Sequence, residues 1–526
     1  VPDSAMVVEA TPDSAGARVT APTGSDSAPD VPAVGRVDAP TAAPTDTDPT
    51  APVPADTVFL TTPLLRLGFT SSGALVSARL LEYETFNDSA AEGARVELAP
   101  PSGDGLLRPQ LRLGDRVVSM PLQPATLPDS AGAQRVSFTY GDNGRQAVLT
   151  YAIEPDSYLL QARLQTSGFA QTPQLLLGLP STLRVNEADP DEDRRALAYV
   201  VNGPREGIES VRLRSVEEER SHNGPFTWVA VKNKYFLVAA IAGESGLQFG
   251  GVRAQPRPEE DAADLVATLP AAAGGAFAFD LYVGPQEADR LAALGNGLED
   301  VNPYGWRLLR PILRPISHLI TWALVGLHNT LDMGYGWVLI IFGVLVRIVL
   351  WPLNAKSMRS QLKNMELQPR IKEIQEKYKG SPEIMQKEMM KLYKEGFNPL
   401  GGCLPMLIPF PVLIALFYVF QGTIEFRGVE FLWLPDLSRF DPLYVLPVLL
   451  GATMFLQQWI TSKSTPAHMA NPQMKMMMYF MPVFMTVIFL RFASGLNLYY
   501  VAQNVASIPQ QVQLMRERKA WHANKR

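Results

Sequence analysis

The 526-residue sequence is poor in residues that build covalent or metal-bound scaffolds. It holds one cysteine, Cys403, so no disulfide can form within the chain. Its five histidines are scattered, whereas a structural zinc site needs four ligands that lie close together. No GxxxxGK[ST] motif is present, so a P-loop ATPase has no support. We therefore expect neither a cofactor nor a metal ion.

Residues 1–56 contain no aromatic side chain at all. They hold ten prolines, and nine acidic residues face only Arg18 and Arg36. Such a segment buries too little apolar surface to offset the entropy of ordering it, so it is predicted to be a disordered acidic linker. Because a linker ties two parts together, we also expect an N-terminal segment ahead of Val1.

Residues 57–300 are predicted to form one large β-sandwich. Short runs of Val, Leu, Phe and Tyr alternate with clusters of Gly, Pro, Asp and Asn, which is typical of strands separated by turns. A short helix is expected at Glu287–Leu294. No acid and base stand at a telling spacing, so a scaffold or docking role is the interpretation. The runs that predict strands are Val58–Leu60, Leu75–Leu81, Arg135–Tyr140, Gln146–Ile153, Tyr158–Leu164, Thr227–Val231 and Tyr235–Ile241.

Long apolar stretches dominate the chain from residue 335 onward. They predict five transmembrane helices because about 18 to 20 helical residues cross a bilayer core. The fourth is short and is either a half-span or one arm of a hairpin with the fifth, turning around Ser494-Gly495. The predicted spans are 335–352, 403–424, 443–460, 476–490 and 492–512, within a core of residues 335–515.

Loop charges predict the orientation of these spans. The loop 353–402 carries ten Lys or Arg residues, and basic residues recur in the loop 462–475 and in the tail 516–526. The positive-inside rule places all three in the cytoplasm, so the β domain lies outside and the C-terminus inside. Residues 301–334 are predicted to contain an amphipathic helix on the outer leaflet. Its apolar stripe is Trp306, Leu309, Leu313, Ile316, Ile320, Leu324 and Leu327.

The loop 353–402 is predicted to be a helical hairpin. Gly380-Ser381-Pro382 marks its turn, with Pro382 at the first position of the returning helix. Apolar residues at helical spacing support both arms, among them Met358, Leu362 and Met365 in the first. Its basic face suits ribosomal RNA or acidic lipid, and it is equally consistent with a solvated surface.

Arg347 is the charged residue within the first predicted span. An unpaired guanidinium in lipid is costly, so it faces either a hydrated groove or, by snorkelling past Pro352, the inner membrane interface. The five spans contain no Asp, Glu or His, which argues against an intramembrane enzyme and favours a water-lined cavity around Arg347. No inverted repeat is evident, which argues against a secondary transporter.

Polar residues within the spans supply candidate walls for such a groove. Hydrogen bonds between helices are the alternative role for each of them. Gln503 and Asn504, near the middle of the last span, are the better groove candidates. The others are Gln457, Gln458, Thr486 and Asn497. Methionines crowd the start of the fourth span, which suits a surface for varied apolar partners or simple contact with lipid.

Several motifs resemble the YidC/Oxa family of membrane protein insertases. The strongest is Phe397-Asn398-Pro399-Leu400-Gly401-Gly402-Cys403-Leu404-Pro405, which opens the second span. Further matches are Leu367-Gln368-Pro369-Arg370-Ile371, Val346-Arg347, Asp441-Pro442-Leu443-Tyr444 and Ser494-Gly495-Leu496-Asn497-Leu498-Tyr499-Tyr500. Within 57–300, Trp228-Val229-Ala230, Tyr235-Phe236 and Tyr282-Val283-Gly284-Pro285 resemble the large periplasmic domain of the Gram-negative branch.

The resemblance implies a bacterial inner-membrane insertase and chaperone, not an enzyme, with a five-helix core around a hydrophilic groove. It implies nascent membrane proteins, the Sec translocon, the ribosome and the lipid bilayer as partners of a chain that acts as a monomer. Arg347 matches the family's groove arginine, and Tyr500 a client-contacting tyrosine. The second and fourth spans match the greasy slide, which places Phe410, Leu413, Phe417 and Met481 beside a client. Pro409 and Gly343 depart from some relatives, so the polar lining differs here.

Overall fold

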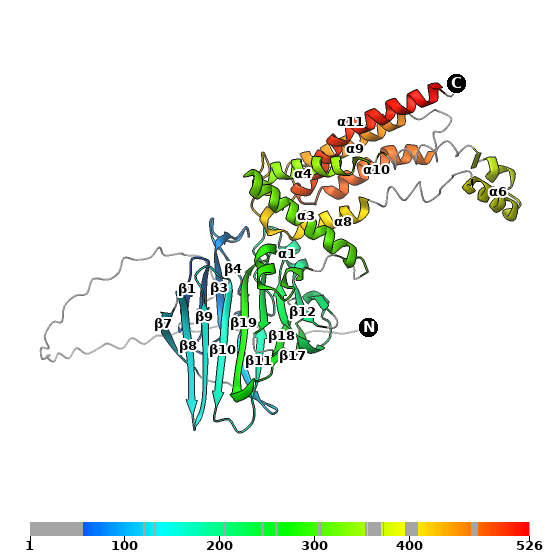
Figure 1. Cartoon of the computed structure of the whole chain (residues 1–526). Helices are drawn as coiled ribbons and strands as arrows, with labels where there is room; N and C mark the ends of the chain where they lie inside the picture. The colour runs from blue at the N-terminus through cyan, green and yellow to red at the C-terminus, as the bar shows by residue number, and fades with distance from the viewer. Residues whose placement is uncertain are drawn as a thin grey trace, which may run out of the picture. The chain divides into compact units, whose positions relative to one another are not determined.

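The structure is a computed structural model, shown in Figure 1. It describes residues 56–524 except 119–121, 131, 205–206, 244–246, 258–260, 303–304, 306–307, 353–354, 356–369, 372, 395–408 and 464–471. Residues 1–55 of the predicted linker 1–56 therefore lie outside the described residues. So do much of the first arm of the predicted hairpin, with Met358, Leu362 and Met365, and the start of the second predicted span.

The described residues between 58 and 285 form antiparallel β-sheets, which confirms the predicted β-rich domain. Each run named above lies on a strand, apart from the first residue of the runs that begin at Tyr158, Thr227 and Tyr235. The predicted short helix is α2 (Ala288–Leu294). The strands are β1 (Val58–Thr61), β2 (Leu65–Phe69), β3 (Leu75–Glu84), β4 (Arg95–Glu97), β5 (Arg108–Leu113), β6 (Arg116–Val118), β7 (Gln123–Ser130), β8 (Ala133–Asp142), β9 (Arg145–Ile153), β10 (Leu159–Ser167), β11 (Gln174–Leu179), β12 (Ala198–Gly203), β13 (Gly207–Arg212), β14 (Arg220–Phe226), β15 (Trp228–Lys232), β16 (Phe236–Ala242), β17 (Phe249–Arg257), β18 (Ala262–Leu269) and β19 (Ala276–Pro285).

Three sheets can be traced in this part of the chain. The largest has the order β13-β12-β15-β16-β19-β10-β9-β8-β7, and Figure 1 shows β8, β9, β10 and β19 running side by side. The second has the order β14-β17-β18-β11-β5-β6, and the third β1-β2-β3-β4. Inward side chains of all three sheets belong to one buried core, so the sheets share a single hydrophobic interior. This is the packing expected of a sandwich.

The register follows from the alternation of residues along the strands. On β10 every second residue is buried, and Leu160, Ala162 and Leu164 point inward. β16 is buried at nearly every position, so it is covered on both faces and reads as a continuous apolar run. The predicted strands at Tyr158–Leu164 and Tyr235–Ile241 therefore owe their patterns to two different positions in the sheet.

The remaining described residues are mainly helical. A short helix, α1 (Pro190–Ala196), begins at the capping side chain of Asp189. Single turns are η1 (Leu213–Ser215), η3 (Ala273–Gly275), η4 (Leu298–Asp300) and η5 (Ile424–Phe426). The long helices are α3 (Arg310–Leu331), α4 (Tyr335–Val349), α6 (Pro382–Lys394), α8 (Pro409–Gly422), α9 (Val445–Lys463), α10 (Pro472–Phe489) and α11 (Ser494–Asn524).

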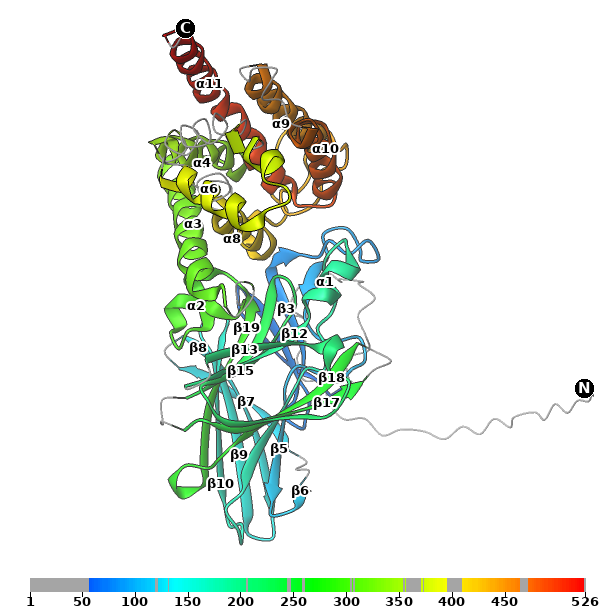
Figure 2. The same ribbon diagram turned by 90° about the vertical axis from the view of Figure 1, so that its right-hand side faces the viewer.

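The long helices build a second hydrophobic core. It includes Leu313 of α3, Leu339 of α4, Phe420 of α8, Leu450 of α9 and Tyr499 of α11. α11 packs against both α4 and α9, α9 packs against α10, and α3 packs against α8. Figure 2 shows α9, α10 and α11 grouped together. Close approach requires small residues: a Cβ on Gly451 of α9 would meet Thr486 Oγ1 of α10 at 2.0 Å.

Each of the five predicted spans overlaps one long helix, namely α4, α8, α9, α10 or α11. Within the described residues, no single helix combines the length and apolar character needed to cross a membrane. α3 and α4 meet that test as a pair, with a bend of 120° between them. Shorter apolar helical segments are Pro411–Gly422, Val445–Ile460 and Tyr479–Phe489. The turn between α10 and α11 begins after Phe489 and ends at Ser494, where the hairpin was expected.

α3 differs from the predicted amphipathic helix in the partner of its apolar stripe. Leu313, Ile320 and Leu324 are buried in the helical core, where α3 packs against α8. A second apolar face of α3 is exposed instead, and Trp322 on that face is 73% exposed. Spacing in the sequence predicts that this face is covered, but it does not distinguish a protein neighbour from lipid. The position of α3 on the outer leaflet stays a prediction. α6 begins at Pro382, as the predicted turn requires.

Candidate functional site

The charged side chain in α4 is held by a side chain near the middle of α11. Arg347 Nη2 donates to Gln510 Oε1 at 2.6 Å, and Gln510 Nε2 donates to the carbonyl oxygen of Trp351 at 3.0 Å. Gln510 is buried, with 1% of its surface exposed. The amide therefore bridges the end of α4 to α11 and fixes one edge of the guanidinium.

An open hollow of about 480 Å³ lies beside Arg347, between α4 and α11. Its lining is apolar apart from the guanidinium, and Arg347 Nε is buried with no hydrogen-bond partner among the described residues. A charge beside such a surface is poorly solvated, so it attracts polar or acidic groups that enter the hollow. The lining residues are Ile340, Val344, Arg347, Ile348, Trp351, Leu498, Val501, Ala502, Val505, Ala506 and Pro509.

The polar residues predicted as groove walls do not line this hollow. Asn504 Nδ2 donates to Thr453 Oγ1 at 3.2 Å, and Gln457 Nε2 donates to the Asn504 carbonyl oxygen at 3.0 Å. Gln511 Nε2 then donates to Gln457 Oε1 at 3.0 Å. These bonds join α9 to α11. Gln457 and Asn504 therefore have the alternative role given above, which is hydrogen bonding between helices. Gln503 is half-buried on α11.

Two residues predicted to contact a client, Phe417 and Tyr500, belong to one aromatic cluster. The Phe417 ring lies 5.3 Å from that of Phe492, which lies 4.9 Å from that of Phe489. The Tyr500 ring meets Phe489 edge-on at 5.6 Å. The cluster thereby joins α8, α10 and α11. The Tyr500 hydroxyl is buried, and no described residue hydrogen-bonds to it.

The other predicted contact residues lie on faces of α8 and α10. Leu413 on α8 is 40% exposed, and Met481 on α10 is half-buried. Next to Met481, α10 carries an exposed apolar face that includes Phe480 and Val483, which is 64% exposed. Phe410 lies on α8, but its side chain is outside the described residues. Large exposed apolar faces of this kind mark a surface for lipid or for an apolar partner.

Sequence reasoning missed the residues that support this site. Gln510 is not among the polar residues singled out from the sequence, yet it positions Arg347. Gly343 was noted only as a departure, although a Cβ there would come within 3.1 Å of the Tyr499 carbonyl oxygen. A glycine inside an apolar helix is a usable sign of close packing. In the described part of the chain, no three His, Cys, Asp or Glu residues are grouped so as to hold a metal ion.

Two family models match the chain. Residues 57–319 match the YidC periplasmic domain, and residues 326–521 match the 60Kd inner membrane protein family. Together they span both the β domain and the helical region described above.

Curated relatives cover most of the chain. A membrane protein insertase YidC from Chlorobium limicola is 36% identical over 396 residues, which is 70% of this chain and 66% of the relative. The same-named protein from Chlorobium phaeovibrioides is 36% identical, and the match covers 73% of this chain and 70% of the relative. The membrane protein insertase YidC from Coxiella burnetii is 30% identical over 483 residues, and the match covers 87% of this chain and 80% of the relative. The chain thus spans about two thirds of the length of the first of these relatives.

Solved structures show a looser likeness. A crystal structure described as an active YidC insertase with its first transmembrane domain resolved is 19% identical, with a TM-score of 0.36. The match covers 88% of this chain and 94% of that one.

Proposed function

Since the chain belongs to the YidC family of membrane protein insertases, we propose that it moves hydrophobic segments of new membrane proteins from the cytoplasm into the inner membrane and assists their folding. The family is one of insertases and not of enzymes. The observation that carries the mechanism is the placement of Arg347 beside an apolar hollow, with Gln510 as its hydrogen-bond acceptor.

The proposed topology places the β domain in the periplasm and the C-terminus in the cytoplasm. α4, α8, α9, α10 and α11 are the proposed spans, since they cover the five apolar stretches. The basic loop 353–402 and tail 516–526 then lie on the cytoplasmic side. This arrangement gives Arg347, near the cytoplasmic end of α4, access to segments that arrive from the ribosome.

The proposed path uses two different surfaces. A short polar flank of the client occupies the hollow near Arg347, where the guanidinium offsets part of its desolvation cost. The apolar part of the client moves past the Phe417 and Tyr500 cluster and along the exposed faces of α8 and α10, near Leu413 and Met481. Burial of apolar surface in lipid, at roughly 25 cal/mol per Å², drives the helix outward. No nucleotide-driven step is required.

The proposed partners follow from charge and location. Nascent membrane proteins are the clients, and the lipid bilayer receives them. The basic loop 353–402 and the tail suit contact with the ribosome, whose RNA is a polyanion. We propose that the chain works as a monomer, alone or beside the Sec translocon. Gln503 and Asn504 remain proposed client-facing residues, and the hydrogen bonds of Asn504 give it a structural role as well.

Reconstitution into lipid vesicles tests the proposal. Ribosomes bearing a stalled single-span client are added, and insertion is read by protection of the client from protease. We expect wild-type chain to insert the client and Arg347→Gln to insert it about five-fold more slowly, equivalent to about 1 kcal/mol. Arg491→Gln is the matched control because Arg491 is exposed between α10 and α11. Vesicles that transport a small solute but leave the client unprotected would contradict an insertase and favour a transporter.

A further inference from the structure

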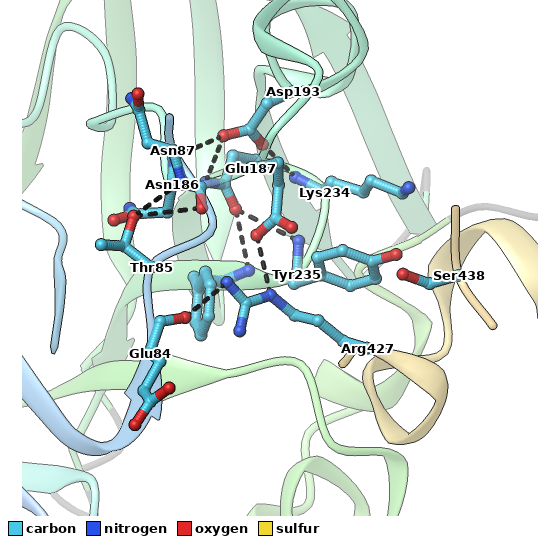
Figure 3. A network of polar contacts seen from close by, with 12 residues as sticks. Glu84, Thr85, Asn87, Asn186, Glu187, Asp193, Lys234, Tyr235, Arg427 and Ser438 are labelled. Carbon is cyan, nitrogen blue, oxygen red and sulfur yellow. Dashed lines mark hydrogen bonds and ion pairs between the residues drawn. The ribbon is translucent and has the colours of Figure 1, made fainter. Parts of the chain in front are cut away.

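A single arginine on the loop after α8 is buried in the β domain. Arg427 follows η5, and its side chain is only 3% exposed. Arg427 Nε donates to Glu187 Oε1 at 2.8 Å, and Arg427 Nη2 donates to the carbonyl oxygen of Glu84 at 2.8 Å. Figure 3 shows the guanidinium pointing toward both acceptors. A connecting loop seldom buries a charge, so this contact is a built feature of the molecule.

Aromatic rings of the β domain complete the surroundings of this guanidinium. Its carbon lies 4.3 Å from the centre of the Phe86 ring and 5.4 Å from that of Phe236. The Tyr235 ring is at 6.0 Å. A guanidinium over aromatic faces gains cation–π attraction while its edge stays free for hydrogen bonds. The site accordingly fits the planar fork of arginine better than the ammonium of lysine.

The acceptor side of the site is fixed within the β domain. Burial raises the pKa of Glu187 even though the Arg427 guanidinium opposes that rise, as expected for a dry site. The neighbouring carboxylate of Asp193 accepts from the backbone N–H groups of Asn186 and Lys234, both at 3.2 Å. Phe86 N donates to the Asn186 carbonyl oxygen at 2.8 Å. These bonds hold Glu187 and Phe86 in place for the arginine, and Figure 3 shows Glu187, Asn186 and Asp193 beside it.

The residue before Arg427 points into the other core. Phe426 is fully buried, stacks on Phe420 of α8 at 5.0 Å and meets Tyr335 of α4 edge-on at 5.3 Å. Two consecutive residues therefore enter two different cores, Phe426 that of the helices and Arg427 that of the β domain. Gly428 follows at a φ of +71°, and a Cβ there would lie 2.7 Å from the Phe86 ring. A larger residue would displace that ring from the guanidinium.

We propose that Arg427 is a positioning residue, through which the β domain fixes the outer end of α8. This rests on the proposed function, because α8 forms one wall of the client path. Since Phe426 and Arg427 are adjacent in the chain, a tilt of α8 at this end must break the contacts of one of them. The β domain, for which a scaffold or docking role was expected, thereby sets the position of a helix that guides the client.

Spin-label distances test the positioning directly. In a Cys403→Ser background, labels are placed at Gln421, exposed at the outer end of α8, and at Asp156, on an exposed turn of the β domain. We expect one narrow distance distribution in the otherwise unaltered chain and a broad one in Arg427→Ala. Arg427→Lys should recover part of the narrowing, because it keeps the charge but lacks the fork. Arg439→Ala is the matched control, since Arg439 is an exposed arginine of the same loop.

A second variant separates loss of the contact from damage by an unpaired charge. Arg427→Ala leaves Glu187 buried without its partner, which destabilises the fold by itself. In the double variant Arg427→Ala with Glu187→Gln that charge is absent, and we still expect a broad distribution. If Arg427→Ala does not fold, Glu187→Gln alone carries the test, since it keeps the side-chain volume and removes the ion pair.

Client insertion in vesicles supplies the functional readout. We expect Arg427→Ala and the double variant to insert a client about five-fold more slowly, within the range of typical coupling between sites. Arg439→Ala should match the parent. The inference would be overturned if Arg427→Ala and the double variant both kept a narrow distance distribution and inserted the client at the rate of the parent chain. Failure of the parent chain itself to insert any client would instead refute the proposed function, so the two failures are distinguishable.

Discussion

Gly343 of α4 lies against the backbone of Tyr499 of α11, where a Cβ at position 343 would come within 3.1 Å of the Tyr499 carbonyl oxygen. The two helices approach this closely because residue 343 has no side chain. They also line the hollow beside Arg347. The shape of that hollow therefore depends on a glycine.

Gly343→Val should push α4 away from α11. Overpacking of this kind costs about 1–3 kcal/mol, so we expect a lower unfolding temperature in detergent and slower client insertion. Gly326→Val on α3 is the control, because nothing lies within 4 Å of a Cβ at that position. Equal unfolding temperatures and insertion rates in the two variants would show that neither stability nor insertion depends on the close approach at Gly343.

The bond from Arg347 to Gln510 predicts a second stability effect. Gln510→Leu removes the acceptor of Arg347 Nη2 and leaves a buried donor unpaired, which costs about 1–3 kcal/mol. Thermal unfolding in detergent should show this loss. Gln513→Leu, three residues on and exposed, should leave the unfolding temperature unchanged. An unchanged unfolding temperature in Gln510→Leu would mean that Arg347 finds another acceptor.

Asn504 and Gln503 are neighbours on α11 for which we predict different effects. Asn504→Leu breaks the bond to Thr453, and such a bond between membrane helices is worth about 0.6 kcal/mol. Thr453→Val should cost about the same, and the double variant no more than either. Gln503→Leu should slow insertion while its unfolding temperature stays at the wild-type value. Additive losses for Asn504 and Thr453 would contradict the assigned bond.

Glu425 gives the fold a dependence on pH. Burial, together with the carboxylates of Glu287 and Asp289, raises the pKa of Glu425 from 4.5 to about 7. The folded chain then binds this proton more tightly than the unfolded chain does. The charged group destabilises the fold above pH 7, and the effect disappears as the pH falls toward 4.5.

Glu425→Gln should therefore raise the unfolding temperature by about 2 °C at pH 9 and leave it unchanged at pH 4. The exposed Glu430, on the same loop, is the control, and Glu430→Gln should shift neither value. A gain of the same size at both pH values would rule out titration of Glu425 as the cause.

Local patterns predicted much of the fold because local physics decides it. Alternation along Tyr158–Leu164 predicts β10, since each second residue must reach the core. The continuous apolar run at Tyr235–Ile241 is equally informative, since β16 is covered on both faces. Pro382 after Ser381 fixes the start of α6. Each of these features involves residues close together in the sequence.

Contacts between distant residues were beyond such patterns. Arg427 and Glu187 are separated by 240 positions, and neither has a neighbour in sequence that indicates the other. The same holds for Arg347 and Gln510, 163 positions apart. The stripe on α3 was read correctly as apolar, but its partner is α8. Spacing identifies a face that must be covered, whereas the chain's three-dimensional course decides what covers it.

Site-specific photo-crosslinking tests the central claim, that a client passes the aromatic cluster between α8, α10 and α11. Crosslinkers replace Phe417 and Tyr500 in that cluster, and Val448 as a control on α9 that is 59% exposed. With ribosomes bearing a stalled single-span client, we predict adducts at 417 and 500 and none at 448. Silence at all three positions while the client becomes protease-protected in the same vesicles would contradict the proposed path.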